Sequence, residues 1–320
     1  MAVAVAHPNI ALVKYWGKAD SERNLPAAES LSLTLGAMFT QAQVELSGGS
    51  TDALVINGVS RSDKELLRVS RFLDLIGGSN RARARVTSTT NFPMSAGLAS
   101  SAAAFAALAL AGSAAYGSKL DRRELSILAR RGSGSAARSM LGGFVRVRIE
   151  SVDGYVEAFA EQVESKLELH AAIAIVKGGE KELGSTDGME HTRQTSPYHS
   201  QWLSTVTKDM KAAIVALGSG DFEALADVTE GNALAMHADA MAARPGILYF
   251  EPETLELVRA LRALRKSGVL VTFTIDAGPN VVALAPAREL PKVTEALAAI
   301  LGSDRVLTSP PGEGAKLVES

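Results

Sequence analysis

The stretch NFPMSAGLASS (Asn91–Ser101) is the most informative part of the chain for both fold and chemistry. A strand pattern ends at a proline, small residues and a glycine follow, and an alanine-rich helical pattern then runs to Tyr116. The first N–H groups of such a helix point outward with no bulky side chains nearby, which suits phosphate binding. Ser100 and Ser101 add hydroxyls for phosphate oxygens or a magnesium ion. The same pattern also fits an ordinary strand-to-helix turn, and it lacks the glycines and lysine of a GxxxxGK[ST] loop or a dinucleotide fingerprint.

Length and composition bound the rest of the interpretation. The chain has 320 residues, a formal net charge of -2 and no cysteine. This length allows about two domains, each with its own core. Without cysteine there is no disulfide frame, thiolate metal site or cysteine nucleophile, and five scattered histidines suggest no metal cluster. The small net charge gives no overall attraction to nucleic acid or to an anionic membrane, so we expect neither partner.

Neither a signal peptide nor a membrane span is expected. Residues 1–6 are apolar but have no basic leader. Residues 86–118 carry no charge, yet they include Asn91, Pro93 and Gly97, and their apolar part is mostly alanine. We therefore expect a cytoplasmic protein.

The first half of the chain alternates strand and helix patterns. Arg81, Arg83 and Arg85 alternate with small residues, as on one face of a strand, and a solvated face is favoured over phosphate binding. The pattern predicts strands at 3–15, 32–46, 53–59 and 144–149, with an Asn57-Gly58 hairpin turn, and helices at 62–76, 97–116 and 122–130.

The second half reads as an α+β sandwich, with a domain boundary near residue 180. Glycines near 218–220 end one helix, and Asp221 can cap the next. The pattern predicts strands at 167–176, 269–275, 281–284 and 315–318, a mainly helical region at 186–243, and helices at 253–267 and 290–301.

Two further segments gather polar groups. HPNIALVKYWGK (His7–Lys18) places amide, phenol and ammonium groups on an otherwise apolar strand. GSGSAARS (Gly132–Ser139) sets hydroxyls and a guanidinium near a glycine-loosened helix start, which is a good anion cradle. Taken separately, Lys14 and Lys18 also fit a solvated strand end, and Arg138 also fits a surface ion pair.

Together with DAGPN (Asp276–Asn280) and GSTDGM (Gly184–Met189), these segments resemble the diphosphomevalonate decarboxylases. This family belongs to the kinase superfamily of galactokinase, homoserine kinase and mevalonate kinase, and the resemblance spans nearly the whole chain. It implies an α+β, two-domain small-molecule-kinase fold. Residues 1–180 would form a ribosomal protein S5-like α/β domain for nucleotide phosphates and catalysis, and residues 181–320 a ferredoxin-like α+β domain that completes the substrate site.

The resemblance also implies a reaction. The family converts mevalonate 5-diphosphate and ATP to isopentenyl diphosphate, ADP, phosphate and carbon dioxide, a step of isoprenoid biosynthesis by the mevalonate pathway. ATP and Mg²⁺ would be the cofactors, and the protein would be a homodimer. Phosphorylating the tertiary hydroxyl makes it a good leaving group, so no pyridoxal or thiamine is needed.

By resemblance, the site residues divide by role. Asp276 would orient the 3-hydroxyl and take its proton, although an Asp before Gly-Pro is also a common turn cap. Arg138 would hold the substrate carboxylate, and Asn9 would help to fix the carboxylate or the arginine. The diphosphate would be gripped by Tyr15, Lys18, Ser133, Ser135 and the backbone near Met189. The nucleotide would contact Ser88, Gly97, Leu98, Ala99, Ser100 and Ser101, with Ser101 also a ligand for Mg²⁺.

Three positions differ from what many members of the family have, and the first two lie close to this site. Ala28-Glu29 replaces a more usual Asn-Ser pair, Met94-Ser95 alters the loop before Gly97, and Thr186 stands where some bacterial members have arginine. Glu29 is either a harmless exposed loop residue or a group that disfavours the diphosphate. The rival activities are decarboxylation of mevalonate 5-monophosphate and 3-phosphorylation alone, and the rival of another class is a silent binding protein on the same fold.

Overall fold

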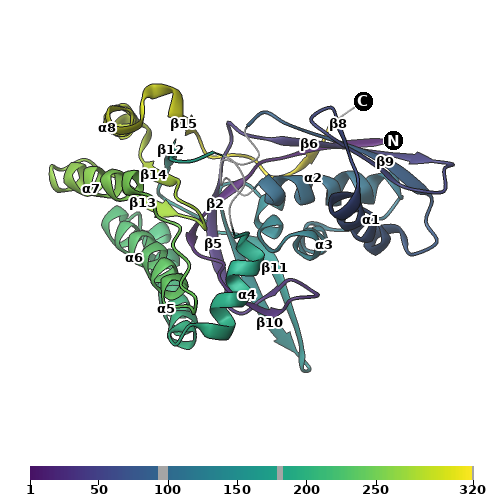
Figure 1. Cartoon of the computed structure of the whole chain (residues 1–320), viewed down its shortest axis with the longest axis horizontal. Coiled ribbons are helices and arrows are strands. Elements are labelled where there is room, and N and C mark those ends of the chain that lie inside the picture. Colours follow the sequence, from purple (N-terminus) through teal and green to yellow (C-terminus); the bar gives the residue numbers. More distant parts are fainter. Residues whose placement is uncertain (93–99, 179–182, 319–320) are drawn as a thin grey trace.

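Residues 1–92, 100–178 and 183–318 are described in this computed structural model of the chain. Figure 1 shows two groups of elements. One sheet with helices α1 to α3 against it lies to the right, and helices α5 to α8 lie to the left of the central strands β2 and β5. The α+β class expected from the sequence is confirmed. No helix within the described residues is long and apolar enough to cross a membrane.

The first sheet has six strands, and all its ladders are antiparallel except the parallel β7–β9 pair. In order across the sheet, its strands are β16 (Lys316–Leu317), β1 (Ala2–Ala6), β6 (Thr40–Ser47), β9 (Arg83–Thr90), β7 (Ala53–Ile56) and β8 (Val59–Arg61). The expected hairpin between β7 and β8 is confirmed, since Asn57 and Gly58 both have positive φ.

Three helices cover this sheet: α1 (Asp63–Gly77), α2 (Ser100–Ala115) and α3 (Arg122–Gly132). Helix α2 is largely buried, with ten of its 16 residues buried, and it is mostly alanine, so its backbone packs closely against β1 and β6. Helix α3 begins at a capping box in which Asp121 and Glu124 satisfy each other's backbone N–H groups. These helices bring the start of α2 and the end of α3 together.

The second sheet is built from β11 (Tyr155–Gln162), β10 (Phe144–Val152), β5 (Ser30–Thr34) and β2 (Asn9–Val13), in that order. Side chains alternate across a strand, so the SLSLT sequence of β5 sends Leu31 and Leu33 to a large apolar core and Ser30 to the other face. That other face is covered by the 3₁₀ helix η1 (Gly134–Met140). A short hairpin, β3 (Lys18–Asp20) and β4 (Leu25–Pro26), follows β2 in the chain.

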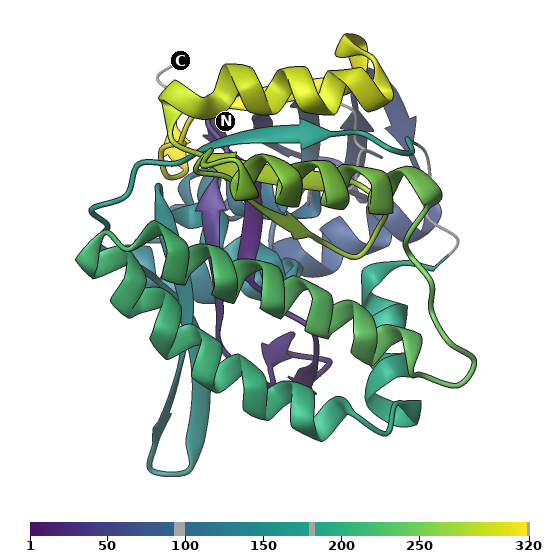
Figure 2. The same ribbon diagram turned by 90° about the vertical axis from the view of Figure 1, so that its left-hand side faces the viewer.

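The third sheet has the antiparallel order β13 (Thr272–Ile275), β14 (Val281–Ala285), β12 (His170–Ala174) and β15 (Val306–Ser309). Both its faces are buried, because Ala171 and Ile173 of β12 join the central core while Ala172 and Ala174 pack under α7 and α8. The helices are α4 (Ser185–Thr195), α5 (His199–Ser219), α6 (Phe222–Met241), α7 (Pro252–Lys266) and α8 (Leu290–Leu301), with short 3₁₀ turns η2 (Ala287–Glu289) and η3 (Ser303–Arg305). Figure 2 shows α5 to α8 stacked across one side of the molecule. Asp221 caps α6 as expected, accepting from the Ala224 N–H.

The chain does not divide cleanly at one residue. Strand β12 precedes residue 180 but pairs with β14 and β15, and β16 at the end of the chain pairs with β1 in the first sheet. The last expected strand therefore forms, but it belongs to the first half rather than to the C-terminal sandwich. Domains of 1–180 and 181–320 stay a proposal.

The solvated face expected for three alternating arginines is wrong for Arg81. Strand β9 begins only at Arg83, and the Arg81 side chain turns inward to bind both carboxylate oxygens of Asp52, at 2.8 and 2.6 Å. Both side chains are almost fully buried. Burial raises the pKa of Asp52, but hydrogen bonds from Arg81 and Ser70 outweigh it and lower that pKa to about 2.

We predict that Arg81→Ala lowers the free energy of unfolding by about 3 to 5 kcal/mol, because Asp52 is left buried without its partner. Urea denaturation checks this, and Arg85→Ala on the exposed side of β9 is the matched control, with a change within about 0.5 kcal/mol. Equal effects of the two substitutions would contradict the buried pair. Because the folded pKa of Asp52 is depressed, this stabilisation is present above about pH 4 and is lost as the pH falls toward about 2.

Candidate active site

The candidate residues meet where the second sheet, η1 and the end of β13 adjoin. Lys14 follows β2, Arg138 lies in η1, and Asp276 directly follows β13. These three side chains are therefore supplied by segments up to 262 residues apart in the chain.

Lys14 and Asp276 form a buried ion pair. The Lys14 ammonium donates to Asp276 Oδ1 at 2.5 Å and to the Ala11 carbonyl at 2.8 Å, and Lys14 is only 2% exposed. Burial lowers the pKa of Lys14, and the Asp276 charge opposes this shift. The solvated strand end considered for Lys14 is thus wrong. A single lysine within the apolar run ALVKYW is the sequence signal for this burial, and the family resemblance implies no role for it.

Arg138 is the second buried cation. Its Nε donates to Asn9 Oδ1 at 3.1 Å, and its Nη1 donates to the Ser30 hydroxyl at 2.5 Å. Burial lowers the pKa of Arg138 to about 10, so the guanidinium stays charged at neutral pH. With 3% exposure and no carboxylate bound to it among the described residues, Arg138 is not the surface ion pair that the sequence also allowed.

Asn9 fixes the orientation of that guanidinium. Its amide donates to Ser139 Oγ at 2.8 Å and to the Ser135 carbonyl at 3.2 Å, which leaves Oδ1 to accept from Arg138. Asn9 and Ser30 lie at opposite ends of the antiparallel β2–β5 ladder, and Arg138 lies between them, with Nε toward Asn9 and Nη1 toward Ser30. The sequence predicted that Asn9 fixes either the substrate carboxylate or the arginine; the structure shows its contact with Arg138, and its role toward a substrate stays a prediction.

A row of serine hydroxyls begins beside Asn9, which donates to the Ser135 carbonyl. Ser133 Oγ is 3.1 Å from Ser101 Oγ and 3.4 Å from Ser135 Oγ, so the described start of α2 and the start of η1 face each other. Gly97, Leu98 and Ala99 lie outside the described residues. Ser100 is the first residue of α2 as described, whereas Ser88 lies within β9, opposite Ala42 and Ile56 in the two neighbouring strands.

Cations flank the hydroxyl row. Lys18 donates to Asn24 Oδ1 at 2.7 Å, and its pKa is lowered by burial and by the nearby Arg68. Arg68, from α1, donates to the Gly132 carbonyl at 2.7 Å and stacks 4.5 Å from the centre of the Phe105 ring. Arg68 could not be predicted from the sequence, because an arginine on the polar side of an amphipathic helix carries no distinguishing signal.

Tyr15 and Met189 complete the set of predicted residues. The Tyr15 hydroxyl is buried without a hydrogen-bond partner among the described residues, and burial raises its pKa. It lies so close to Gly134 that a side chain there would overlap the phenol ring. Met189 is 5% exposed and belongs to the central core, so only the backbone of α4 near it is available to a ligand.

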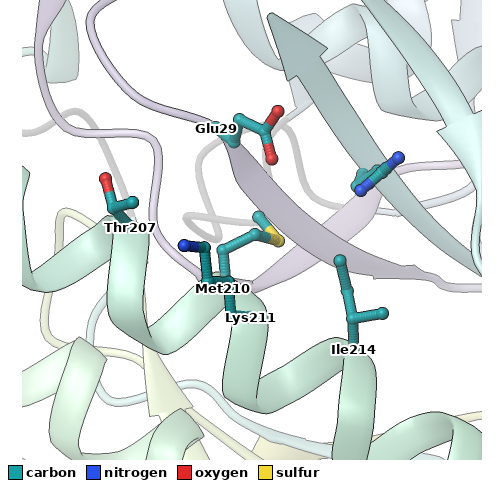
Figure 3. Close-up of a pocket in the computed structure, with 6 residues that line it drawn as sticks. Glu29, Thr207, Met210, Lys211 and Ile214 are labelled. Atoms are coloured by element: carbon teal, nitrogen blue, oxygen red, sulfur yellow. The ribbon is translucent and has the colours of Figure 1, made fainter.

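Glu29 points away from Arg138. One oxygen of its carboxylate accepts from the Ile149 N–H at 3.2 Å, and the residue is half-buried rather than exposed. Figure 3 shows Glu29 facing α5 across a cavity of about 280 Å³, which Glu29 lines together with Arg146, Thr207, Met210, Lys211 and Ile214. Ser30, the next residue, turns to the opposite face and contacts Arg138. Glu29 is therefore not the exposed loop residue that the sequence allowed, and an effect of its charge on the diphosphate stays a prediction.

The fold and site bring together a buried lysine–aspartate pair, an anchored arginine and a row of serine hydroxyls, and such groups suit a small anionic substrate. Comparison with known proteins gives the family. Residues 6–155 match the diphosphomevalonate decarboxylase-like N-terminal domain, and residues 171–313 match the mevalonate 5-diphosphate decarboxylase C-terminal domain. The chain belongs to the diphosphomevalonate decarboxylase family, and the resemblance seen in the sequence is confirmed.

Individual relatives agree with this assignment. The diphosphomevalonate decarboxylase of Aspergillus fumigatus is 33% identical over 94% of this chain and 80% of its own length, and the human one is 34% identical over 86% and 74%. Among solved structures, the Staphylococcus aureus mevalonate diphosphate decarboxylase has a TM-score of 0.94 and 33% identity, over 99% of this chain and 98% of its own. A complex described as MDDEF with MVAPP, AMPPCP and magnesium has a TM-score of 0.94 and 38% identity, over 100% and 99%.

We predict that Asn9→Ala lowers the free energy of unfolding by about 1.5 to 3 kcal/mol, because the charged Nε of Arg138 is left buried without its acceptor. Guanidinium denaturation checks this. Gln201→Ala removes an exposed amide from α5 and serves as the control, with almost no change. If Asn9→Ala is as stable as the control, Asn9 does not hold the guanidinium.

Proposed function

We propose that this chain catalyses the ATP-dependent decarboxylation of mevalonate 5-diphosphate to isopentenyl diphosphate, ADP, phosphate and carbon dioxide. The observation that carries the proposal is the pairing of Lys14 with Asp276 beside the anchored Arg138, because this site provides separately for phosphoryl transfer and for a carboxylate. The relatives support it, since a solved relative is described as a complex with MVAPP, AMPPCP and magnesium.

The chemistry requires a leaving group. Breaking the bond to carbon dioxide leaves an electron pair, and this pair forms the new double bond as the oxygen on the neighbouring tertiary carbon departs. Hydroxide leaves poorly and phosphate leaves well, so the 3-hydroxyl is first phosphorylated by ATP. The protein must therefore supply one group that accepts the proton of the 3-hydroxyl and another that binds the substrate carboxylate.

Asp276 is the group that we assign to the hydroxyl. Lys14 occupies Oδ1, so Oδ2 is the oxygen that accepts the hydroxyl proton as the oxygen attacks the γ-phosphate. The Lys14 ammonium fixes the carboxylate and adds positive charge where phosphoryl transfer concentrates negative charge.

Arg138 is the group that we assign to the carboxylate. Its Nε is taken by Asn9 and one Nη1 hydrogen by Ser30, so the remaining hydrogens of Nη1 and Nη2 form a fork for two carboxylate oxygens. This fork orients the bond that breaks. Since the guanidinium is held by two neighbours before substrate arrives, little ordering is left to be done on binding.

The 5-diphosphate is assigned to the anion cradle. Ser133 and Ser135 supply hydroxyls, Lys18 and Arg68 supply charge, and the buried Tyr15 hydroxyl supplies a further donor. The backbone near Met189 is the remaining predicted contact.

ATP is assigned to the start of α2, with Ser100 and Ser101 on its phosphates and Ser88 nearer the base. Within the described residues, no group of three or more His, Cys, Asp or Glu could hold a metal. This suits Mg²⁺ held largely by ATP phosphates with the Ser101 hydroxyl as a protein ligand, and the ion would neutralise phosphate charge there. Homodimeric assembly and a cytoplasmic location are carried over from the sequence as part of the proposal, and light scattering tests the first.

The experiment that tests the function measures ADP and carbon dioxide separately, with ATP, Mg²⁺ and either mevalonate 5-diphosphate or mevalonate 5-monophosphate. The proposal expects equal amounts of both products from the diphosphate. ADP without carbon dioxide would indicate a 3-kinase, faster turnover of the monophosphate would indicate the sister activity, and no product would indicate a binding protein.

We predict that Arg138→Lys slows carbon dioxide release by roughly one to three powers of ten, because lysine keeps the charge but loses the fork that aligns two oxygens. Affinity for ATP stays within about twofold, and any accumulation of the 3-phosphorylated intermediate shows that the two steps have separated. Arg288→Lys, on an exposed side chain, is the control. Wild-type rates in Arg138→Lys would remove Arg138 from the mechanism.

A further inference from the structure

The segment from Lys14 to Gly17 lies between two strands without belonging to either. Strand β2 ends at Val13 and β3 begins at Lys18, yet Lys14 and Trp16 are buried. Buried backbone groups need hydrogen-bond partners, and a segment outside a ladder must find them elsewhere. The segment also carries Lys14 and Tyr15 and leads directly into Lys18.

Helices α5 and α6 supply partners for this backbone. The Lys14 N–H donates to Asn232 Oδ1 at 2.7 Å, and the Trp202 indole donates to the Trp16 carbonyl at 2.7 Å. Asn232 is in turn fixed by its own donation to Asp209 Oδ2, also at 2.7 Å. Asn232 and Trp202 are both buried, so these bonds are shielded from water.

A second pair, His199 and Asp239, packs against Gly17. His199 Nδ1 lies 2.8 Å from Asp239 Oδ2, and both residues are buried. The imidazole edge, Cε1 and Nε2, lies 3.2 Å from the position that a Cβ on Gly17 would take. Gly17 has a φ of +137°, which few other residues adopt. The imidazole therefore packs directly on the backbone of the segment from Tyr15 to Lys18, which we call the Gly17 turn.

The spacing of the polar residues on α5 and α6 directs them all toward the Lys14–Gly17 segment. Asn232 and Asp239 are seven residues apart on α6, and Trp202 and Asp209 are seven apart on α5, so each pair lies on one side of its helix. Buried polar side chains cost free energy that apolar residues would not, so stability alone does not account for them.

We propose that the His199–Asp239 pair is a positioning pair for the substrate diphosphate: by fixing the turn at Gly17, it sets Tyr15 and Lys18 toward the Ser133–Ser135 cradle. The inference rests on the proposed function, because it assigns that cradle to the diphosphate. Asn232 does the corresponding task for Lys14, whose backbone it holds while the side chain reaches Asp276. Helices α5 and α6 of the C-terminal half thereby position phosphate-binding residues that lie in the N-terminal half.

The test uses His199→Leu in the full-length enzyme. Losing the imidazole frees the Gly17 turn, so we expect the KM for mevalonate 5-diphosphate to rise at least about tenfold, the equivalent of about 1.4 kcal/mol. We expect the KM for ATP to stay within about twofold. His199→Gln, whose amide can still donate to Asp239, restores most of the affinity, and His170→Leu on β12 is the control for loss of a histidine.

Several outcomes would overturn the proposal. A normal KM for the diphosphate in folded His199→Leu removes the positioning role, as does an equal rise in both KM values, which marks general damage. If His199→Leu does not fold, Asp239→Asn keeps the shape and decides the question by the same KM split. If the wild type does not act on mevalonate 5-diphosphate, the proposed function fails. Crystal structures then test the positioning role separately. A displaced Gly17 turn in His199→Leu would support that role, and an unchanged Gly17 turn would contradict it.

Discussion

The contact between the Lys14 ammonium and the Asp276 carboxylate is the constraint on which the site depends. A buried charge needs a partner, and this pair joins the end of β2 to the end of β13 across two different sheets. The backbone around Lys14 must therefore be placed accurately relative to the third sheet. Thr274 contributes to that placement, since its hydroxyl donates to the same Ala11 carbonyl that accepts from Lys14.

The same arrangement explains why strand β5 has one polar and one apolar side. Leu31 and Leu33 bind the sheet to the core beneath α5 and α6, while Ser30 and Asn9 hold Arg138 on the other side. A shift of one residue in either strand would send the polar groups into the core and the leucines toward η1. The apolar packing thus fixes the register that the arginine requires, and stability and site geometry are set by the same strands.

Much of this could be predicted from sequence where the signal is local. Asn57-Gly58, Asp221 and the alternating pattern of β5 each specify structure through short-range rules, and the DAGPN and GSGSAARS motifs pointed to Asp276 and Arg138 through family resemblance. Partners far apart in sequence could not be predicted in this way. Whether Lys14 is solvated or buried depends on Asp276, and the inward turn of Arg81 depends on Asp52, so local pattern alone misassigned both. His199 gave no signal because its role depends on contact with Gly17.

The central claim is that Lys14 and Asp276 act as one unit in phosphoryl transfer. A double-mutant cycle with Lys14→Met and Asp276→Asn, measured as the single-turnover rate of ADP formation in variants whose folding has been checked by circular dichroism, tests it most directly. The account predicts that each substitution costs at least about a hundredfold, and that the double variant is less than about tenfold slower than the slower single variant. Losses that multiply to about ten-thousandfold would show that the two residues act independently, and would contradict the account.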